Sequence, residues 1–171
     1  MWIDLTPEME RYARSIEKAM KGVVAPLGPN YTGLAVDERF FIGYLGDTFV
    51  AKMLELAGKR YSYIPHLIGQ EGTDDIDVWV MGERVTIEIK ATPSLNHRYL
   101  MMPSQQFARF VPDHPTIYVA VFIGTEGAEI AGYAHREDFE ETFVRIPTMQ
   151  VHRDNLHSID YLLERLDNAD I

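Results

Sequence analysis

The fold is decided by the stretch Asp74-Asp75-Ile76-Asp77-Val78-Trp79-Val80-Met81-Gly82-Glu83-Arg84-Val85-Thr86-Ile87-Glu88-Ile89-Lys90. Apolar and polar residues alternate in both halves, with the period of two that is typical of a β-strand with one buried face. Because a glycine lies near the centre, we expect a hairpin that turns at residues 81–83. The alternation places Glu88 and Lys90 on one face of the second strand, and Asp77 on the polar face of the first.

This predicted hairpin carries acids where a buried strand would be apolar. Two carboxylates that meet in one place repel one another and are costly to desolvate unless a cation lies between them. A hard divalent cation that prefers oxygen ligands, such as Mg²⁺, is the natural candidate. Asp77 and Glu88 are therefore candidate metal ligands, and the contribution of the neighbouring Asp75 stays open.

Asp77, Glu88 and Lys90 form the pattern Asp-x(10)-Glu-x-Lys, which resembles that of the PD-(D/E)xK nuclease superfamily. The superfamily pattern is an acid that opens one strand, a turn, and Glu-x-Lys in the next strand; the proline that often precedes the acid is absent here. The resemblance covers roughly residues 38–134. It implies an α/β fold with a restriction-endonuclease-like core, in which helices flank a mixed central sheet in the order αβββαβ.

The resemblance also implies a mechanism for the site. Asp77, Glu88 and the main-chain carbonyl of Ile89 would bind one Mg²⁺ ion, for which Mn²⁺ would substitute. The ion would activate a water molecule and stabilise charge on the phosphate. Lys90 would orient that water and offset the developing charge.

Two further residues match the superfamily less closely. Many members carry Gly-Glu in the helix before the first core strand, and Asp47 after Gly46 occupies that place, with Glu38 as the runner-up. As an alternative, Asp47 is an early-turn charge that favours the helix dipole. Gln106, followed four residues later by a phenylalanine, partly matches a Gln-x-x-x-Tyr motif whose amide lies near the scissile phosphate in some members.

Periodicity and turn residues predict the other elements. We interpret residues 1–36 as an N-terminal helical extension and residues 37–171 as a nuclease-like domain, in one globular unit overall. The expected helices are one that begins after Thr6 and ends before Gly22, and others at 37–57, 105–111, 137–143 and about 156–166. Besides the hairpin, whose second strand should stop soon after Lys90, the expected strands are 61–64, 116–123 and 130–134.

Composition limits the classes of function. The chain has 171 residues and no cysteine, which excludes disulfides and thiolate metal sites and fits a cytoplasmic protein. No apolar run is long enough to span a membrane. A net charge of -10 argues against a broad basic surface for nucleic acid. We therefore expect weak intrinsic DNA affinity, or help from a protein partner or a second copy of the chain.

The sequence thus predicts a metal-dependent nuclease that hydrolyses phosphodiester bonds, with DNA favoured over RNA. One alternative is a catalytically inactive protein of the same fold that serves as a nucleic-acid-binding or assembly module. A second alternative is structural, with Glu88 and Lys90 as an exposed ion-pairing face of the sheet.

Overall fold

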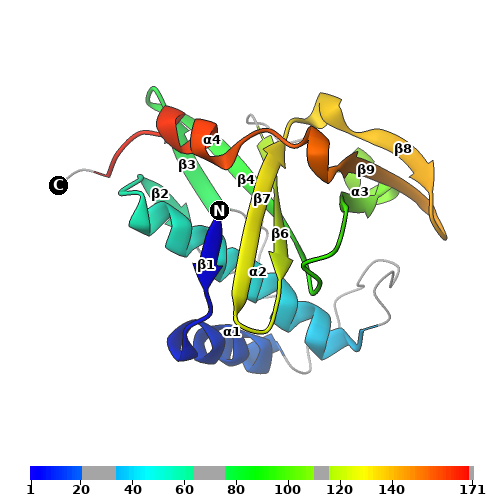
Figure 1. Cartoon of the computed structure of the whole chain (residues 1–171), viewed down its shortest axis with the longest axis horizontal. Helices are drawn as coiled ribbons and strands as arrows, with labels where there is room; N and C mark the ends of the chain where they lie inside the picture. The colour runs from blue at the N-terminus through cyan, green and yellow to red at the C-terminus, as the bar shows by residue number, and fades with distance from the viewer. Residues whose placement is uncertain (21–33, 64–75, 110–115, 170–171) are drawn as a thin grey trace.

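The computed structural model describes residues 1–20, 34–63, 76–109 and 116–169, and it is an α/β fold built around a mixed, curled sheet (Figure 1). In chain order the elements are β1 (Trp2–Asp4), α1 (Pro7–Met20), α2 (Val36–Leu56), β2 (Tyr61–Tyr63), β3 (Ile76–Val80), β4 (Glu83–Thr92), β5 (Tyr99–Pro103), α3 (Ser104–Arg109), β6 (Thr116–Ile123), β7 (Gly127–Ala134), η1 (Arg136–Asp138), β8 (Glu140–Phe143), β9 (Pro147–His152), η2 (Arg153–Asn155) and α4 (Ile159–Arg165).

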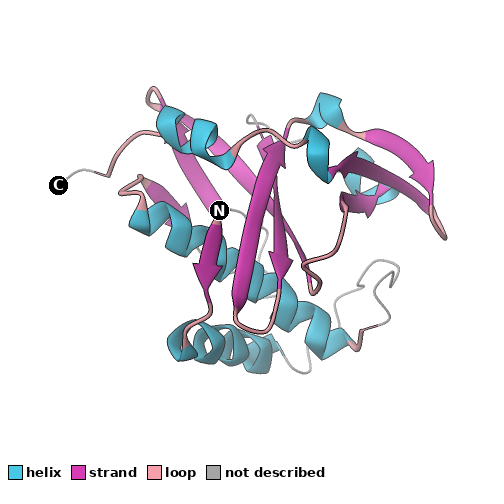
Figure 2. Cartoon of the chain, in the orientation of Figure 1, coloured by secondary structure: helices cyan, strands magenta, loops and turns pink. Residues whose placement is uncertain are grey.

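The main sheet has six strands in the order β1-β7-β6-β4-β3-β2. All neighbours are antiparallel except β4 and β6, which are parallel. A second sheet of three antiparallel strands, β5-β9-β8, projects to one side of the first (Figure 2). The two sheets are linked through the β4–β5 connection and through α3, which leads from β5 back into β6.

The predicted order of helix, three strands, helix and strand is observed as α2, β2, β3, β4, α3 and β6, with β5 as an additional strand before α3. A parallel pair needs a crossover connection, since the chain must return to the end at which the first strand began. The segment between Thr92 and Thr116, which contains β5 and α3, is that crossover. The predicted α/β class is therefore confirmed.

Helix α2 is the central element of the larger core, and it runs behind β6 and β7 in Figure 1. It ends where the sequence predicts: Gly58 has a φ of +64°, a backbone conformation that a residue without Cβ adopts at low cost. Its side chains are buried around most of the helix surface, because strands, α1 and α4 share one cluster with it. The buried ones are Phe41, Tyr44, Leu45, Phe49, Val50, Met53 and Leu54.

One glycine of α2 allows the helix to lie close against β4. A Cβ atom built on Gly46 would be 2.6 Å from the Cβ of Ala91 and 3.5 Å from Cγ2 of Ile89. Gly43, one turn earlier in the same helix, has no atom within 4 Å of such a Cβ. Gly46 is therefore required for close packing of the helix against the strand, whereas Gly43 is not.

These two glycines give a matched prediction. Gly46→Ala should lower the free energy of unfolding by roughly 1–3 kcal/mol, because the helix and strand must separate to admit the methyl group. Gly43→Ala should raise the free energy of unfolding by about 0.5–1 kcal/mol, since alanine restricts the unfolded chain and favours the helix. Urea unfolding of both variants measures the difference. Equal shifts in the two would contradict the close helix–strand contact.

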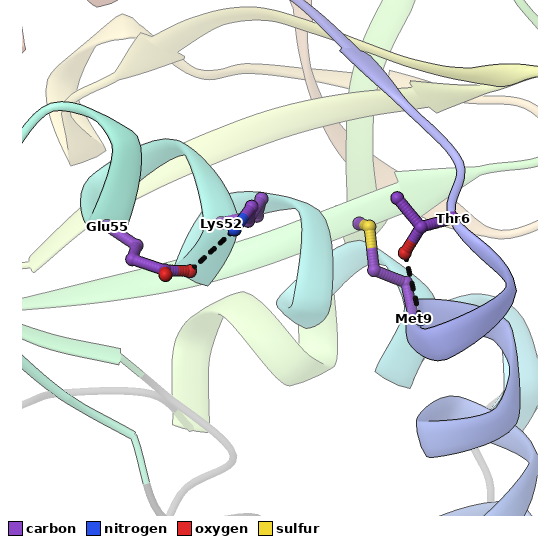
Figure 3. A network of polar contacts seen from close by, with 4 residues as sticks. All are labelled: Thr6, Met9, Lys52 and Glu55. Carbon is purple, nitrogen blue, oxygen red and sulfur yellow. Dashed lines mark hydrogen bonds and ion pairs between the residues drawn. The ribbon is translucent and has the colours of Figure 1, made fainter.

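The N-terminal segment is integrated into this core. Strand β1 pairs with β7, and α1 packs against α2 through buried Met9, Ala13 and Ile16. Thr6 caps α1 as predicted, since its Oγ1 accepts a hydrogen bond of 3.2 Å from the main-chain N–H of Met9 (Figure 3). The described part of the predicted extension thus shares a sheet and a core with the rest of the chain.

The β3–β4 hairpin turns at Met81 and Gly82, both of which have positive φ, as a two-residue turn of this kind requires. The chain after α4 holds this turn in place. The Asp167 carboxylate accepts hydrogen bonds from the N–H groups of Met81 at 2.8 Å and Gly82 at 2.7 Å. The Asp167 main chain also pairs with Trp79 and Arg60, so the hairpin is fixed from outside its own sequence.

One sequence prediction about the elements was wrong. The helix expected at 137–143 is instead a short 3₁₀ turn followed by strand β8, because the buried Phe139 anchors the segment and β9 pairs with its backbone. The second strand of the hairpin ends at Thr92, soon after Lys90 as predicted, and it pairs with β6 up to that residue. Strands β1, β5 and β9 were not foreseen. No helix in the described part of the chain is both long and apolar enough to cross a membrane.

Candidate active site

The candidate site lies on the face of β3 and β4 that is turned away from α2. Odd-numbered residues of β4, Ile89 and Ala91, meet α2 at Gly46. Side chains alternate along a strand, so Glu88 and Lys90 point to the opposite face. Asp77 is directly opposite Thr86 in the β3–β4 register, which places it on the face of Glu88 and Lys90 as well.

Asp77 is held by two side chains of β4. Its Oδ2 is 2.6 Å from Nη2 of Arg84, and its Oδ1 accepts a hydrogen bond of 3.1 Å from Oγ1 of Thr86. Its side chain is 20% exposed, whereas that of Arg84 is 49% exposed. The carboxylate therefore has a cationic partner in the folded chain without a metal ion.

Glu88 and Lys90 form an ion pair with one another, in which Nζ of Lys90 donates to Oε1 of Glu88. The two side chains are only 15% and 20% exposed. They lie beside β6, where Tyr118 is the register partner of Glu88. A pair of opposite charges at this depth is screened less by solvent than a surface pair.

Asp77 and Glu88 are diagonal neighbours on adjacent strands, an arrangement in which Cα atoms are roughly 7–8 Å apart. Each carboxylate is bonded to its own cation, Arg84 in one case and Lys90 in the other. Within residues 1–20, 34–63, 76–109 and 116–169, no three acidic or histidine side chains are close enough together to hold a metal ion. Asp75, the acid whose role the sequence left open, lies outside the described residues.

Asp47 contacts the α2 side of the sheet. Its side chain is buried, and its Oδ2 accepts a hydrogen bond of 3.2 Å from the hydroxyl of Tyr63 on β2. Burial and, to a lesser extent, the Asp47 carboxylate raise the pKa of the Tyr12 phenol on α1. The structure thus gives Asp47 two tyrosine neighbours, Tyr63 on β2 and Tyr12 on α1, and does not place it on the face of Glu88 and Lys90.

The remaining predicted residues are spread more widely. Glu38 is exposed in the first turn of α2, and Gln106 is exposed on α3. Ile89 is partly buried and packs against the main core, with its neighbours Glu88 and Lys90 on the other face. Phe110, the second residue of the partial glutamine motif, lies outside the described residues.

Four residues around the site were not singled out from the sequence: Arg84, Thr86, Tyr118 and Arg136. For Arg84 and Thr86 a signal exists, because a two-residue turn at Met81 and Gly82 fixes which residues of β4 are next to Asp77. The other two come from β6 and η1, and only the tertiary fold brings them to this face.

The hydroxyl of Tyr118 lies between charged groups. Burial raises the pKa of this phenol most strongly; the hydrogen bond and positive charge of Arg136 lower it, Glu88 raises it and Lys90 lowers it. The tyrosine is 1% exposed. The candidate site therefore extends beyond the hairpin, to a buried phenol and an arginine.

Comparisons with protein-family models, with curated proteins and with solved structures find no match for this chain.

Proposed function

We propose that this chain is a metal-dependent phosphodiesterase that cleaves nucleic acid, with DNA favoured over RNA, and that its core belongs to the restriction-endonuclease-like type. One observation carries the proposal: Asp77, Glu88 and Lys90 share one face of two adjacent strands, and these strands follow α2 in the order that the motif requires. The parallel pairing of the third core strand with the strand after α3 supports the same interpretation.

The residues at the site fit a hard divalent cation. Two carboxylates and a main-chain carbonyl are oxygen donors, the ligands that Mg²⁺ takes in proteins. Asp77, Glu88 and the carbonyl of Ile89 would hold it. Because both carboxylates already have cationic partners, the ion has to compete with Arg84 and Lys90. We therefore expect an affinity for Mg²⁺ that is weak, on the order of millimolar, and strengthened by the substrate phosphate.

When bound, the ion would supply Lewis-acid stabilisation of charge on the phosphate and lower the pKa of a water molecule. The side chains of the chain do the rest. Lys90, which is bonded to Glu88, would donate a hydrogen bond to the attacking water and offset negative charge as the bond to phosphorus forms. Thr86 fixes the rotamer of Asp77, so that its carboxylate is preorganised on the same face.

The charge of the chain limits how nucleic acid binds. At a net charge of -10, general attraction to a phosphate backbone is absent, so affinity depends on local cations. Arg84 is such a cation, because it lies on the face of Glu88 and its side chain is 49% exposed. We therefore propose weak, strongly salt-dependent DNA binding, or binding aided by a protein partner or a second copy.

One observation favours a second candidate, a catalytically inactive protein of this fold that binds nucleic acid or serves in an assembly. Asp77 and Glu88 are each neutralised by a basic side chain, as they would be in a site that never holds a metal. Incubation of the protein with linear, circular and branched DNA in Mg²⁺ or Mn²⁺ separates the two candidates, because only the nuclease releases shorter products.

Metal binding gives a prediction that does not depend on cleavage. Mg²⁺ at about 10 mM should raise the melting temperature of the wild type, because an ion that binds only the folded state stabilises it by mass action. The increment should shrink in Asp77→Asn, which loses a ligand charge. It should grow in Arg84→Gln, in which the competing cation is removed from Asp77. Differential scanning calorimetry with and without metal measures the increments.

Either of two results would contradict this prediction of metal binding. A melting temperature that does not respond to metal in any of the three proteins would exclude a site on Asp77. An increment of equal size in all three would show that Mg²⁺ binds the chain elsewhere.

A further inference from the structure

Arg136 is directed inward from η1 and joins two other elements. Its guanidinium carbon is 3.9 Å from the centre of the Phe107 ring, and its Nη2 donates a hydrogen bond of 2.9 Å to the main-chain carbonyl of the same residue. Its Nη1 donates a longer bond of 3.5 Å to the hydroxyl of Tyr118. One side chain thus ties α3, through Phe107, to β6, through Tyr118.

The ring of Tyr118 is held by aromatic neighbours. It stacks on Phe107 at 6.0 Å between centroids and meets Phe139 edge-on at 5.0 Å. A phenylalanine would satisfy this packing, so the buried hydroxyl requires a separate explanation, because a polar group that is removed from water is costly unless it is bonded. Arg136 provides the bond, and Glu88 is the register partner on the adjacent strand.

We propose that Arg136 and Tyr118 are positioning residues of the Glu88–Lys90 site. Tyr118, on β6, limits the rotamers that the side chains of Glu88 and Lys90 can adopt. Arg136 holds the phenol of Tyr118 in position. Arg136 also fixes α3, which carries the exposed Gln106, relative to β6. Preorganised neighbours of this kind matter for rate because the reacting groups must be held within fractions of an ångström of their working geometry. The role in catalysis rests on the proposed nuclease function, whereas the placement of the two residues does not.

The placement is tested by NMR of protein labelled with ¹³C at the tyrosine Cζ atom, with the Tyr118 signal assigned from Tyr118→Phe. We expect this signal to move in Glu88→Gln and on addition of Mg²⁺ to the wild type, because both changes alter the charge near the phenol. It should also move in Arg136→Lys, because that substitution removes the guanidinium hydrogen bond to the Tyr118 hydroxyl. Tyr161, which is bonded to Arg165 on α4, is the internal reference and should keep its position. A Tyr118 signal that ignores both Glu88→Gln and Arg136→Lys would overturn the proposal.

The role in catalysis is tested by single-turnover cleavage of DNA. Arg136→Gln should lower the rate about 10–100-fold, the usual effect of removing a group that orients a ligand, with little change in the DNA concentration at half-saturation. Arg136→Lys should recover part of the rate, since it keeps the charge but loses the planar fork. Arg165→Gln is the matched control, because it removes an equivalent arginine–tyrosine hydrogen bond outside the site.

The outcomes separate this inference from the proposed function. If the wild type cleaves and Arg136→Gln is no slower than Arg165→Gln, the positioning role is wrong and the nuclease function stands. If the wild type does not cleave DNA, the nuclease function fails, and the NMR experiment alone decides whether Tyr118 and Arg136 are coupled to Glu88.

Discussion

Glu88→Gln is expected to lower the rate of Mg²⁺-dependent DNA cleavage by roughly 1,000-fold, near the upper end of the loss when one preorganised charge-stabilising group is removed. Glutamine keeps the shape and one oxygen but loses the charge that would hold the ion. The same substitution removes the partner that orients Lys90. Both consequences act on the transition state, so the effect should exceed that of any single contact to DNA.

The measurement is a single-turnover time course with protein in excess over labelled DNA. Glu141→Gln is the matched control, since it removes an exposed acid from strand β8, away from the site. The fold of Glu88→Gln should be retained, because its side chain lies at the margin of the core and is not one of the buried residues. Cleavage by Glu88→Gln at a rate close to that of Glu141→Gln would show that Glu88 is not in the site.

The hairpin that carries the site could be predicted because local rules agree there. Alternation fixes the faces, and the glycine at the turn fixes the register within one residue. For these reasons Asp77, Glu88 and Lys90 could be placed on one face from the sequence alone, and the structure has them there. Helix α1 could be located for a similar reason, because the capping residue Thr6 and the apolar period that follows it indicate the same start.

The neighbours of the acids could not be predicted, because they are set by tertiary structure. In the sequence, Tyr118 is one residue of a predicted apolar strand, and no local sequence feature indicates that β6 lies parallel to β4. Arg136 directly precedes residues 137–143, for which a helix was wrongly predicted. The strands of the second sheet are short, and they form because buried Phe139 and Val151 pack onto the face of β6.

Asp47 shows how a correct local observation can leave a role undecided. The sequence indicates that a carboxylate within the apolar stripe of α2 needs a partner, and the structure provides the hydroxyl of Tyr63. The sequence does not indicate which face of the sheet α2 covers. In the structure, Gly46 allows α2 to pack closely against Ile89 and Ala91, so α2 covers the face of β4 that carries these two residues. Glu88 therefore lies on the opposite face.

Lys90→Met is expected to lower the cleavage rate by about 100–1,000-fold while metal binding persists. Lysine is not a metal ligand, and removal of its charge takes a competitor away from Glu88, so the melting-temperature increment with Mg²⁺ should stay or increase. The loss should appear in the rate at saturating DNA, because the predicted role of the ammonium group is to act on the attacking water and the developing charge. Methionine keeps most of the apolar stem, which limits changes in packing.

Two measurements on wild type and Lys90→Met separate chemistry from binding: single-turnover cleavage in Mg²⁺, and equilibrium DNA binding in Ca²⁺, which takes the same oxygen ligands. Lys52→Met is the control, because Lys52 also forms an ion pair with a glutamate, Glu55 on α2, which is 3.0 Å long, more exposed and away from the site (Figure 3). Binding by Lys90→Met in Ca²⁺ should be nearly unchanged. If Lys90 were instead only a phosphate contact, the salt dependence of log K would fall by about one unit, and cleavage at saturation would be normal. That result would move Lys90 from the catalytic centre to the DNA-binding surface, and the water would then need a different partner on this face of the sheet.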